Sequence, residues 1–325
     1  MSNINKTKLG LIVGPTASGK TAVSIALAQK LNAEIISADS IQVYRGMDIG
    51  SAKPTMEERQ GIPHHMMDAV DIDSPKFSVA EYRRMAGKAI DDIASRGKYP
   101  LVVGGTGLYV NSLIYPLNFT TVPSDEALRE ELTALEQAQK GAAYALLQAE
   151  DPKAAQRLHP NDIKRVIRAL EVVRLTGKPI DDHGGDFANQ AQAEIPYEPT
   201  IIGLTMPREM LYERINLRVD IMLQHGLPDE ARAIYDAGYA PSLPALQGLG
   251  YKQLFKHFAG EYTFDQAIEA IKLETRHFAK RQLTWFRRDE NAFRLYADEM
   301  TQEELLSEAQ RVCSEFLVPE RIWSV

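Results

Sequence analysis

The sequence predicts an α/β protein in which a parallel sheet is flanked by helices and interrupted by a mostly helical insert domain. Short apolar runs that alternate with helical patterns lie at residues 11–13, 35–36 and 101–103. This β-α-β-α-β alternation is typical of a parallel sheet. Near Pro116 the chain changes to consecutive helical patterns, and an apolar strand returns at residues 200–206. The expected parts are a core at 1–120 and 200–325 and an insert at 121–199.

Composition favours a globular protein without a membrane segment. The chain has 325 residues, of which 44% are hydrophobic and 25% charged, as in ordinary soluble domains. No run of about 18 apolar residues predicts a membrane span, and the opening MSNINKTKLG lacks signal-peptide character, so a cytoplasmic protein is expected. The single cysteine, Cys313, excludes an internal disulfide and is expected to be buried.

The string GPTASGKT follows the first apolar run and precedes a helical pattern, which is the setting of a phosphate-binding loop. Its residues are Gly14, Pro15, Thr16, Ala17, Ser18, Gly19, Lys20 and Thr21. The glycines let successive backbone N–H groups converge on an anion at a helix N-terminus. Lys20 adds a positive charge, and the Thr21 hydroxyl can ligate Mg²⁺ held by phosphates. The sequence therefore predicts a P-loop NTPase-like core that binds a di- or triphosphate.

Asp39 follows the second apolar run, at the sheet edge where open α/β folds handle ligands. Three roles are open to it: a magnesium ligand through water, a general base, or a cap of the local turn. The glycines at 104, 105 and 107 follow the third run, and either permit close approach of a ligand or form a plain strand-to-helix turn. Adjacent His64 and His65 do not predict a metal site, because neighbouring side chains do not converge.

Several helices are predicted after Asp39. Ser78 is a candidate N-cap and Gly97 a stop for one of them, and a helix that begins near Ile163 ends at Gly177. The face of that helix opposite its apolar stripe carries Lys164, Arg165, Arg168 and Arg174. On the helix after residue 206, Arg214 and Arg218 share a face, where they can bind a phosphate or pair with acids such as Glu213.

The strongest basic stripe lies in a helix that is expected to run to Asp289, after a hairpin or loop near Gly260. Between Arg276 and Arg288 it has five positive residues and no acid, with Phe278, Trp285 and Phe286 interleaved. Basic residues among aromatics suit phosphate contacts and base stacking, although buried aromatics beside solvated arginines are the alternative. A capping-box helix from Thr301 ends the pattern and is expected only to pack.

Taken together, several stretches of the chain resemble the bacterial tRNA dimethylallyltransferase family, also called tRNA isopentenyltransferases or IPP transferases. In collinear order from about residue 10 to 290 they are GPTASGKT, SADSIQVYRGMDIGSAKPT, PHHMMD, VVGGTGLY, HPNDIKRVIRALEV, RINLRVDIM, GLGYKQ and AKRQLTWFRR. Ser51 stands where the family more often has threonine, and the zinc finger of eukaryotic relatives is absent.

The resemblance implies transfer of a dimethylallyl group from dimethylallyl diphosphate to N6 of adenosine 37, in tRNAs that read codons beginning with U. It implies that Asp39 is the general base, that residues 14–21 hold the diphosphate with Mg²⁺ on Thr21, and that Lys20 and Arg218 stabilise the leaving group. It also implies tRNA contacts at Asp39, Ser40, Ile41, Gln42, Thr106, Arg129, Lys164, Arg165, Val166, Ile167, Arg168, Gly250, Tyr251, Lys252, Gln253, Lys280, Arg281, Gln282, Trp285 and Arg287. The expected partners are a tRNA anticodon stem-loop and dimethylallyl diphosphate, bound by a monomer that is not attached to a membrane.

Two other functions stay open at this point. A P-loop kinase for a small metabolite would use Asp39 to activate a substrate hydroxyl, but would not need the basic and aromatic helix. An RNA-binding module without chemistry would not need an aspartate at the active edge of the sheet.

Overall fold

The computed structural model describes residues 6–74, 77–115, 117, 122, 124–180 and 196–317. The chain divides into two compact units, a core of Met1–Ile114 with Ile195–Val325 and an insert of Tyr115–Glu194. The sequence pattern placed the two boundaries about five residues later, at 121 and 199.

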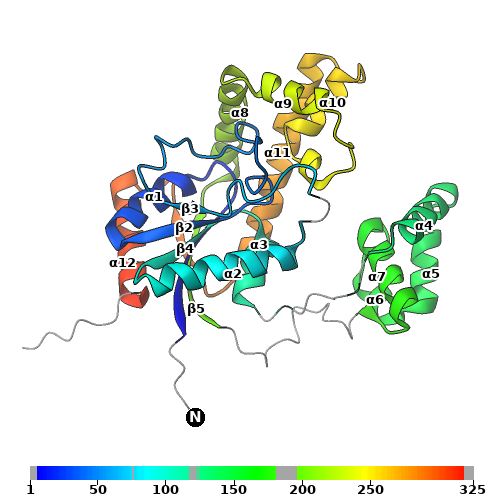
Figure 1. Cartoon of the computed structure of the whole chain (residues 1–325), viewed down its shortest axis with the longest axis horizontal. Coiled ribbons are helices and arrows are strands. Elements are labelled where there is room, and N and C mark those ends of the chain that lie inside the picture. Colours follow the sequence, from blue (N-terminus) through cyan, green and yellow to red (C-terminus); the bar gives the residue numbers. More distant parts are fainter. Residues whose placement is uncertain are drawn as a thin grey trace, which may run out of the picture. The chain divides into compact units, whose positions relative to one another are not determined.

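The core contains a six-stranded sheet with the order β3-β2-β4-β1-β5-β6 (Figure 1). Its strands are β1 (Thr7–Val13), β2 (Ala33–Ala38), β3 (His64–His65), β4 (Tyr99–Gly104), β5 (Tyr197–Thr205) and β6 (Phe293–Tyr296). Every neighbouring pair is parallel, which confirms the predicted parallel α/β sheet. The short edge strands β3 and β6 were not predicted.

Helices connect and cover these strands. In the core they are α1 (Lys20–Leu31), α2 (Val79–Ser95), α3 (Gly107–Ile114), α8 (Arg208–Gln224), α9 (Leu227–Asp236), α10 (Tyr251–Phe258), α11 (Phe264–Phe286) and α12 (Gln302–Leu317), with the short 3₁₀ helix η2 (Pro244–Gln247). Ser78 caps α2 as predicted, through a hydrogen bond from the Glu81 N–H. Between α10 and α11 the chain forms a turn around Gly260 and not a hairpin, and α11 ends at Phe286, before the predicted Asp289.

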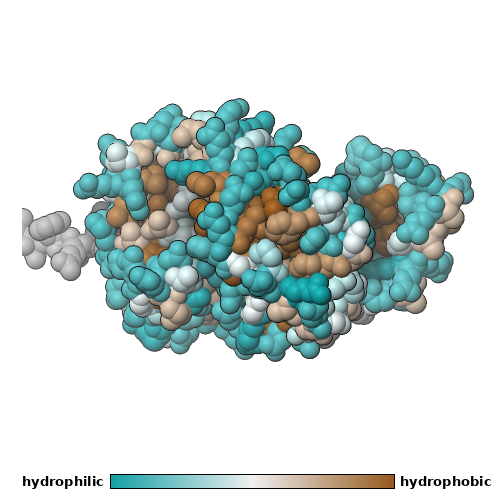
Figure 2. Space-filling view, turned by 90° about the horizontal axis from the view of Figure 1, so that it is seen from above, coloured by the Kyte–Doolittle hydropathy of each residue, from teal (hydrophilic) through white to brown (hydrophobic). Residues whose placement is uncertain are grey.

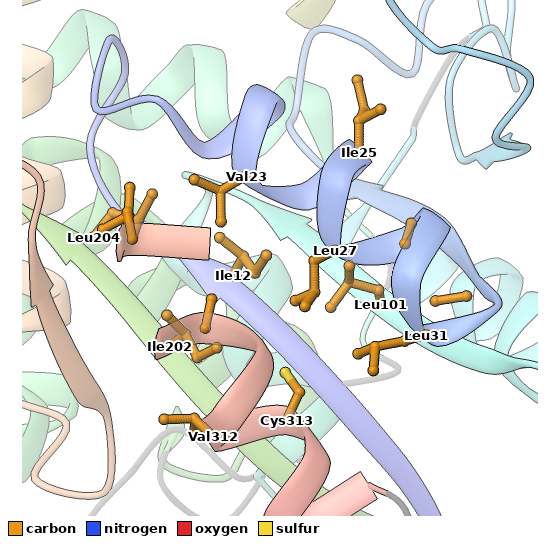
Figure 3. Close-up of a cluster of buried hydrophobic side chains, with 14 of the residues drawn as sticks. Ile12, Val23, Ile25, Leu27, Leu31, Leu101, Ile202, Leu204, Val312 and Cys313 are labelled. Carbon is orange, nitrogen blue, oxygen red and sulfur yellow. The ribbon is translucent and has the colours of Figure 1, made fainter. Parts of the chain in front are cut away.

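One hydrophobic cluster joins α1 and α12 to a face of the sheet (Figure 3). Ile12 and Leu101 of the strands meet Leu27 of α1 and Cys313 of α12 there. Burial raises the pKa of Cys313 to about 12, so this thiol is a packing residue, as expected. Strand residues alternate between faces, and α2 packs on β1, β2 and β4 on the other side of the sheet.

The insert has its own core. In its described part it consists of α4 (Glu126–Ala138), α5 (Ala142–Glu150), α6 (Pro152–Arg157) and α7 (Ile163–Thr176). Leu132, Leu147, Val166 and Leu170 form its centre. Asp151 caps α6, whose first residue is Pro152, and Gly177 ends α7 with a φ of 68°, as predicted for that helix. None of the helices in the described ranges combines the length and apolar character that a membrane crossing requires.

Candidate active site

The phosphate loop lies between β1 and α1, where the sequence placed it. Three of its residues have positive φ: Gly14 at 151°, Ala17 at 64° and Gly19 at 93°. A Cβ on Gly14 would lie 2.6 Å from the Leu204 carbonyl oxygen of β5. The first glycine of the motif is therefore required by the neighbouring strand, because only a residue without a side chain fits there.

Lys20 begins α1, and its Nζ donates a 2.6 Å hydrogen bond to the Pro15 carbonyl across the loop. Desolvation of its ammonium, followed by the positive charge of Arg218, lowers the pKa of Lys20 to about 7, against the opposing effect of Asp39. Desolvation also lowers the pKa of Arg218 itself. Two partly desolvated cations beside one carboxylate form a site that favours an added anion.

Asp39 is held by the turn that follows β2. Its Oδ1 accepts hydrogen bonds from the N–H groups of Ile41, at 2.8 Å, and Gln42, at 3.2 Å. Of the three roles left open by the sequence, the turn cap is therefore present. Both bonds use one carboxylate oxygen, so the cap also fixes the direction of the other oxygen and is compatible with a general base.

Two cavities meet at Asp39 and Arg218. The first has a volume of about 90 Å³ and is lined by Lys20, Thr21 and Gly105 among others. The second, of about 300 Å³, is partly apolar, and its lining includes Ile215, Val219, Met222, Leu227 and Ile271. The residues common to both are Thr16, Asp39, Ser51, Arg218 and Phe278. A group in the first cavity and a group in the second would thus both reach Asp39.

Hydrophobic residues are also exposed on the surface of the protein. Figure 2 shows hydrophobic residues gathered into a patch on an otherwise mostly hydrophilic face. Helix α8, whose Ile215 and Val219 line the second cavity, carries the exposed hydrophobic residues Met210, Leu217 and Ile221 elsewhere on its surface.

The glycine run after β4 is explained by close packing. A Cβ on Gly104 would lie 2.2 Å from the Ala38 carbonyl oxygen, one on Gly105 would lie 2.1 Å from Gln282 Nε2, and one on Gly107 would lie 2.3 Å from the Trp285 ring. Gly104 and Gly105 also line the first cavity. The run therefore lets β2 and α11 approach the turn, and brings the turn to the cavity wall.

Gln282 joins α11 to the phosphate loop. Its Oε1 accepts a 2.8 Å hydrogen bond from the Thr16 N–H, and its Nε2 donates a 2.9 Å bond to the Gly105 carbonyl. Only 5% of the residue is exposed. The family resemblance implied that Gln282 contacts tRNA, but in this structure both the oxygen and the nitrogen of its side-chain amide form hydrogen bonds within the protein.

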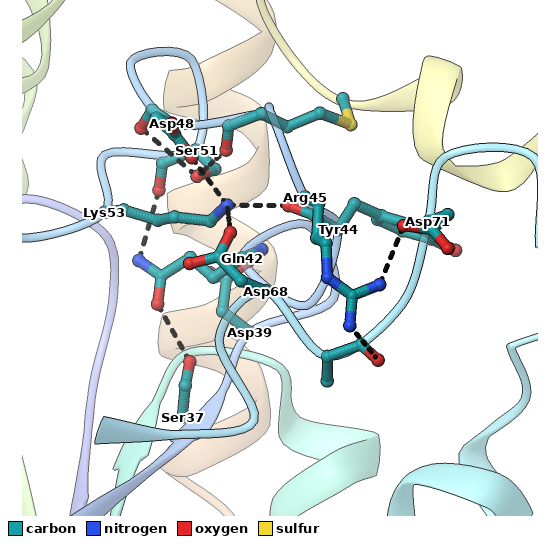
Figure 4. Close-up of polar contacts among 12 residues, drawn as sticks. Ser37, Asp39, Gln42, Tyr44, Arg45, Asp48, Ser51, Lys53, Asp68 and Asp71 are labelled. Atoms are coloured by element: carbon teal, nitrogen blue, oxygen red, sulfur yellow. Dashed lines mark hydrogen bonds and ion pairs between the residues drawn. The ribbon is translucent and has the colours of Figure 1, made fainter. Parts of the chain in front are cut away.

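The side chains of Gln42 and Lys53 hold the segment of residues 47–54 in place (Figure 4). Gly50, Ser51 and Ala52 of this segment line the second cavity. Gln42 Nε2 donates to the carbonyls of Ser51 and Ala52, and its Oε1 accepts from Ser37. The buried Lys53 Nζ contacts the Tyr44 carbonyl at 2.6 Å, Asp48 at 2.7 Å and Asp68 at 2.6 Å. The side chain of Gln42, another predicted tRNA contact, is therefore also used within the fold.

Other predicted contacts near this edge lie on the cavity wall. Ser40 and Ile41 line the second cavity, together with Gly250, Lys252 and Arg281. The Thr106 hydroxyl accepts a 3.1 Å hydrogen bond from the Ser40 N–H, which ties the β4 turn to the Asp39 turn. Tyr251 and Gln253, by contrast, are buried with 0% and 1% exposure, so neither side chain is available to a large partner.

Four basic residues at the C-terminal end of α11 and just after it are exposed. Lys280 and Arg281 of α11, and Arg287 and Arg288 beyond its end, lie on the surface, and within the described ranges no acidic side chain forms an ion pair with them. The Arg281 guanidinium lies over the Phe278 ring, 5.7 Å from its centroid. Arg276 is different, because it donates to Asn216 Oδ1 at 2.7 Å. The exposed part of this stripe is arranged as a phosphate-binding surface would be.

Four arginines of the insert are paired with acids. Arg129 Nε lies 2.9 Å from Glu171 Oε1, and Arg168 contacts the other oxygen of that fully buried carboxylate. Burial alone would raise the pKa of Glu171, but hydrogen bonds from both arginines outweigh it and hold the pKa below its usual range. Arg165 pairs with Asp162 and Arg174 with Glu150.

Three neighbouring positions of α7 differ in their exposure. Val166 and Ile167 are buried in the core of the insert, so the tRNA contacts implied for them cannot be made by their side chains in this structure. Lys164 is exposed on the same helix.

The two histidines of β3 have partners in the fold. His64 Nδ1 lies 2.8 Å from the Ile62 carbonyl, and His65 Nε2 lies 2.7 Å from Glu34. No group of three His, Cys, Asp or Glu residues that could hold a metal ion occurs in the part of the chain that the structure describes. Thr21 lines the first cavity and is exposed there, so its hydroxyl is accessible to an ion carried by a bound phosphate.

A family model, a curated relative and two solved structures that are similar to this chain all belong to enzymes that transfer a prenyl group. Residues 42–289 match the family model described as IPP transferase. The chain is 50% identical over 284 residues to a tRNA dimethylallyltransferase of Alkaliphilus metalliredigens, covering 87% of this chain and 89% of that protein. The crystal structure of a full-length tRNA isopentenylpyrophosphate transferase from Bacillus halodurans is similar with a TM-score of 0.72, 44% identity and coverage of 96% and 97%. A eukaryotic dimethylallyltransferase acting on tRNA has a TM-score of 0.78 at 32% identity, over 95% of this chain and 78% of that one.

Proposed function

Because this chain belongs to the IPP transferase family, we propose that it transfers a dimethylallyl group from dimethylallyl diphosphate to N6 of adenosine 37 in tRNAs that read codons beginning with U. The observation that carries this proposal is the meeting of a phosphate-loop cavity and a larger, partly apolar cavity at Asp39 and Arg218. One cavity suits the diphosphate of the donor, and the other suits a base drawn out of the RNA loop.

The donor end of the site stabilises a leaving group. As the bond between C1 of the dimethylallyl group and the diphosphate oxygen breaks, negative charge grows on the diphosphate. Lys20, the loop N–H groups and Arg218 are placed to neutralise that charge in a partly desolvated site. The adenine N6 amine is a weak nucleophile, so this stabilisation is needed for the reaction to proceed.

The acceptor end of the site needs a proton acceptor. When N6 bonds to C1 it must lose a proton, and the Asp39 carboxylate lies where the two cavities join. Because Oδ1 is occupied by the turn N–H groups, the other oxygen is the one that we assign to the proton transfer.

Mg²⁺ is part of the proposal, and the residues fit a weakly held ion. The Thr21 hydroxyl is exposed in the first cavity, and the described residues offer no acidic cluster there. Mg²⁺ is commonly held by substrate phosphates with few protein ligands, and in that position it would supply positive charge to the leaving diphosphate.

The tRNA would be held mainly through its backbone. We propose that the exposed residues Lys280, Arg281 and Arg287 contact phosphates of the anticodon stem-loop, with the exposed Lys164 of the insert as an additional contact. The protein is expected to act as a monomer in the cytoplasm.

The decisive experiment offers labelled dimethylallyl diphosphate and unmodified tRNA to the wild type and to Asp39→Asn. The asparagine side chain would keep an oxygen that accepts the two turn hydrogen bonds but could not take up a proton. We expect transfer to adenosine to fall at least ~100-fold, with diphosphate affinity within about twofold of the wild type. Transfer that survives the substitution would remove Asp39 as the base.

The same assay separates the alternatives. Phosphorylation of a small metabolite by ATP, without label on adenosine, would support the kinase. RNA binding without any group transfer would support a binding module.

A further inference from the structure

The Glu230 carboxylate holds the loop that contains Asp48, Ile49 and Gly50, although it lies about 180 residues away in sequence. Glu230, in the first turn of α9, accepts hydrogen bonds from three successive backbone N–H groups. Its Oε2 accepts from Asp48 and Ile49, both at 2.9 Å, and its Oε1 accepts from Gly50 at 3.0 Å. Charge-assisted bonds to several amides at once are stronger than neutral ones.

Tyr251 completes this arrangement from α10. Its hydroxyl donates a 2.6 Å hydrogen bond to Glu230 Oε1, and the residue is fully buried. A Cβ on Gly50 would lie 2.6 Å from the Tyr251 ring, so the glycine lets the loop lie directly against the tyrosine. Burial, and next the nearby Glu230 carboxylate, raise the pKa of Tyr251 well above its usual value, so the hydroxyl remains a hydrogen-bond donor.

The opposite end of the same loop is held by Lys53, whose ammonium contacts Asp48 and Asp68. Gly50, which Glu230 binds, and Ser51 and Ala52, which lie between the two attachments, line the second cavity. Ser51 also lines the first cavity, at the junction with Asp39 and Arg218. Leu227 of α9 and Lys252 of α10 form other parts of the second cavity wall. The carboxylate thus joins two walls of one cavity.

We propose that Glu230, together with Tyr251, is a positioning residue that sets the width of the second cavity by holding residues 48–52 against α9 and α10. This proposal rests on the proposed function, in which the second cavity receives the acceptor base. Neither hydrogen-bond set of Glu230 involves the phosphate loop, so the donor diphosphate should bind normally when the attachment is lost.

The first test compares Glu230→Gln with Asp229→Asn, a matched loss of charge at the exposed neighbour on the same helix. The glutamine keeps one acceptor oxygen and places an NH₂ group against hydrogen-bond donors. We expect the KM for tRNA to rise about tenfold and kcat to fall, because a shifted cavity wall would misplace the acceptor base relative to the reacting groups. The affinity for inorganic diphosphate should change less than about twofold. Asp229→Asn should leave all three values unchanged.

Tyr251→Phe provides a second, milder variant that removes one of the four hydrogen bonds. It should raise the KM for tRNA by about two- to threefold. If both residues act through one attachment, the double variant should resemble Glu230→Gln alone instead of showing the product of the two effects. Multiplicative effects would contradict a shared role.

Amide hydrogen exchange tests the attachment without relying on catalysis. The amides of residues 48–50 should be protected in the wild type and exchange faster in Glu230→Gln, with the amides of the phosphate loop unchanged. Unaltered exchange at residues 48–50, or an equal loss of diphosphate and tRNA affinity, would overturn the proposal. If the wild type transferred no prenyl group, the proposed function would fail while the exchange result would still decide whether Glu230 holds the loop.

Discussion

Helix α7 of the insert and helix α11 of the core are both rich in basic residues, but their cations have different surroundings. On α7, Arg165, Arg168 and Arg174 each pair with an acid. On α11 and at its C-cap, the exposed Lys280, Arg281 and Arg287 have no such pair among the described residues. The difference shows that a count of basic residues does not identify a phosphate-binding surface. The positions of the acids decide which cations a nucleic acid can use.

The largest expected effect comes from breaking the paired set at its centre. Glu171→Ala would leave Arg129, Arg168 and the Asp125 N–H without the buried carboxylate. We expect a loss of roughly 3 kcal/mol in the stability of the insert, the lower end for a broken buried ion pair because the arginines are partly exposed. Hydrogen exchange in α4 and α7 measures it, with exposed Glu130→Ala on α4 as the control. Unchanged protection would mean that the pairs are not structural.

The same variant has a pH signature. The folded-state pKa of Glu171 lies below its usual range, so the stability it contributes is present above the unfolded pKa of about 4 and is lost as pH falls below that value. The difference between wild type and variant should therefore shrink in acid.

The next effect compares the two helices directly. Arg281→Gln combined with Arg287→Gln should weaken tRNA binding by about tenfold and lower the slope of log affinity against log salt by about 2, one for each phosphate contact. Arg165→Gln, on the insert, should change affinity less than about twofold because its charge is already paired. An equal loss of tRNA affinity in the two variants would contradict the idea that pairing with an acid makes a cation unavailable to tRNA.

Lys20 represents a third situation, a desolvated cation whose pKa is lowered to about 7. Below that pH it is protonated in the free protein, and as pH rises past 7 the charge is lost, so diphosphate binding must then restore a proton. Relative to Lys20→Arg, affinity should fall roughly fivefold between pH 6.5 and 8. Calorimetry in buffers of different ionisation enthalpy should detect proton uptake at pH 8 for the wild type only.

The smallest effect is expected for the pair of Arg174 and Glu150, which are 2.7 Å apart near the surface of the insert. Replacing both by glutamine should change stability by less than ~1 kcal/mol and leave tRNA affinity unaltered. A thermal unfolding curve and a binding titration are sufficient. A large loss of stability or of tRNA affinity would mean that the pair of Arg174 and Glu150 is as important to the insert as Glu171.

Much of the fold was predictable because its signals are local. The phosphate loop, β1 and α1 follow one another within 31 residues, so spacing alone places them. The absence of acids between Arg276 and Arg288 was also visible in the sequence. Two of the acids that pair with α7 were visible too, since Asp162 and Glu171 lie three residues from Arg165 and Arg168, whereas Glu150 lies 24 residues from Arg174.

The remaining features depend on contacts between distant residues. Strand β6 has only four residues, with Phe293 and Tyr296 exposed, so no apolar run marked it. The partners of Glu230 are backbone amides about 180 residues away, and backbone amides leave no trace in side-chain patterns. The resemblance to the family assigned Gln282 to tRNA, but the burial of this side chain is set by packing between distant residues that the sequence does not reveal.

The packing of α11 against the β4 turn also has a consequence for protein engineering. Gln282 and Trp285 lie against Gly105 and Gly107, whereas Lys280 and Arg281 face outward. A designer who wished to redirect the enzyme to another RNA could vary the outward positions freely in a library. Gln282 and Trp285 would have to stay fixed, because any change of shape there would alter the position of the phosphate loop, to which Gln282 is hydrogen-bonded.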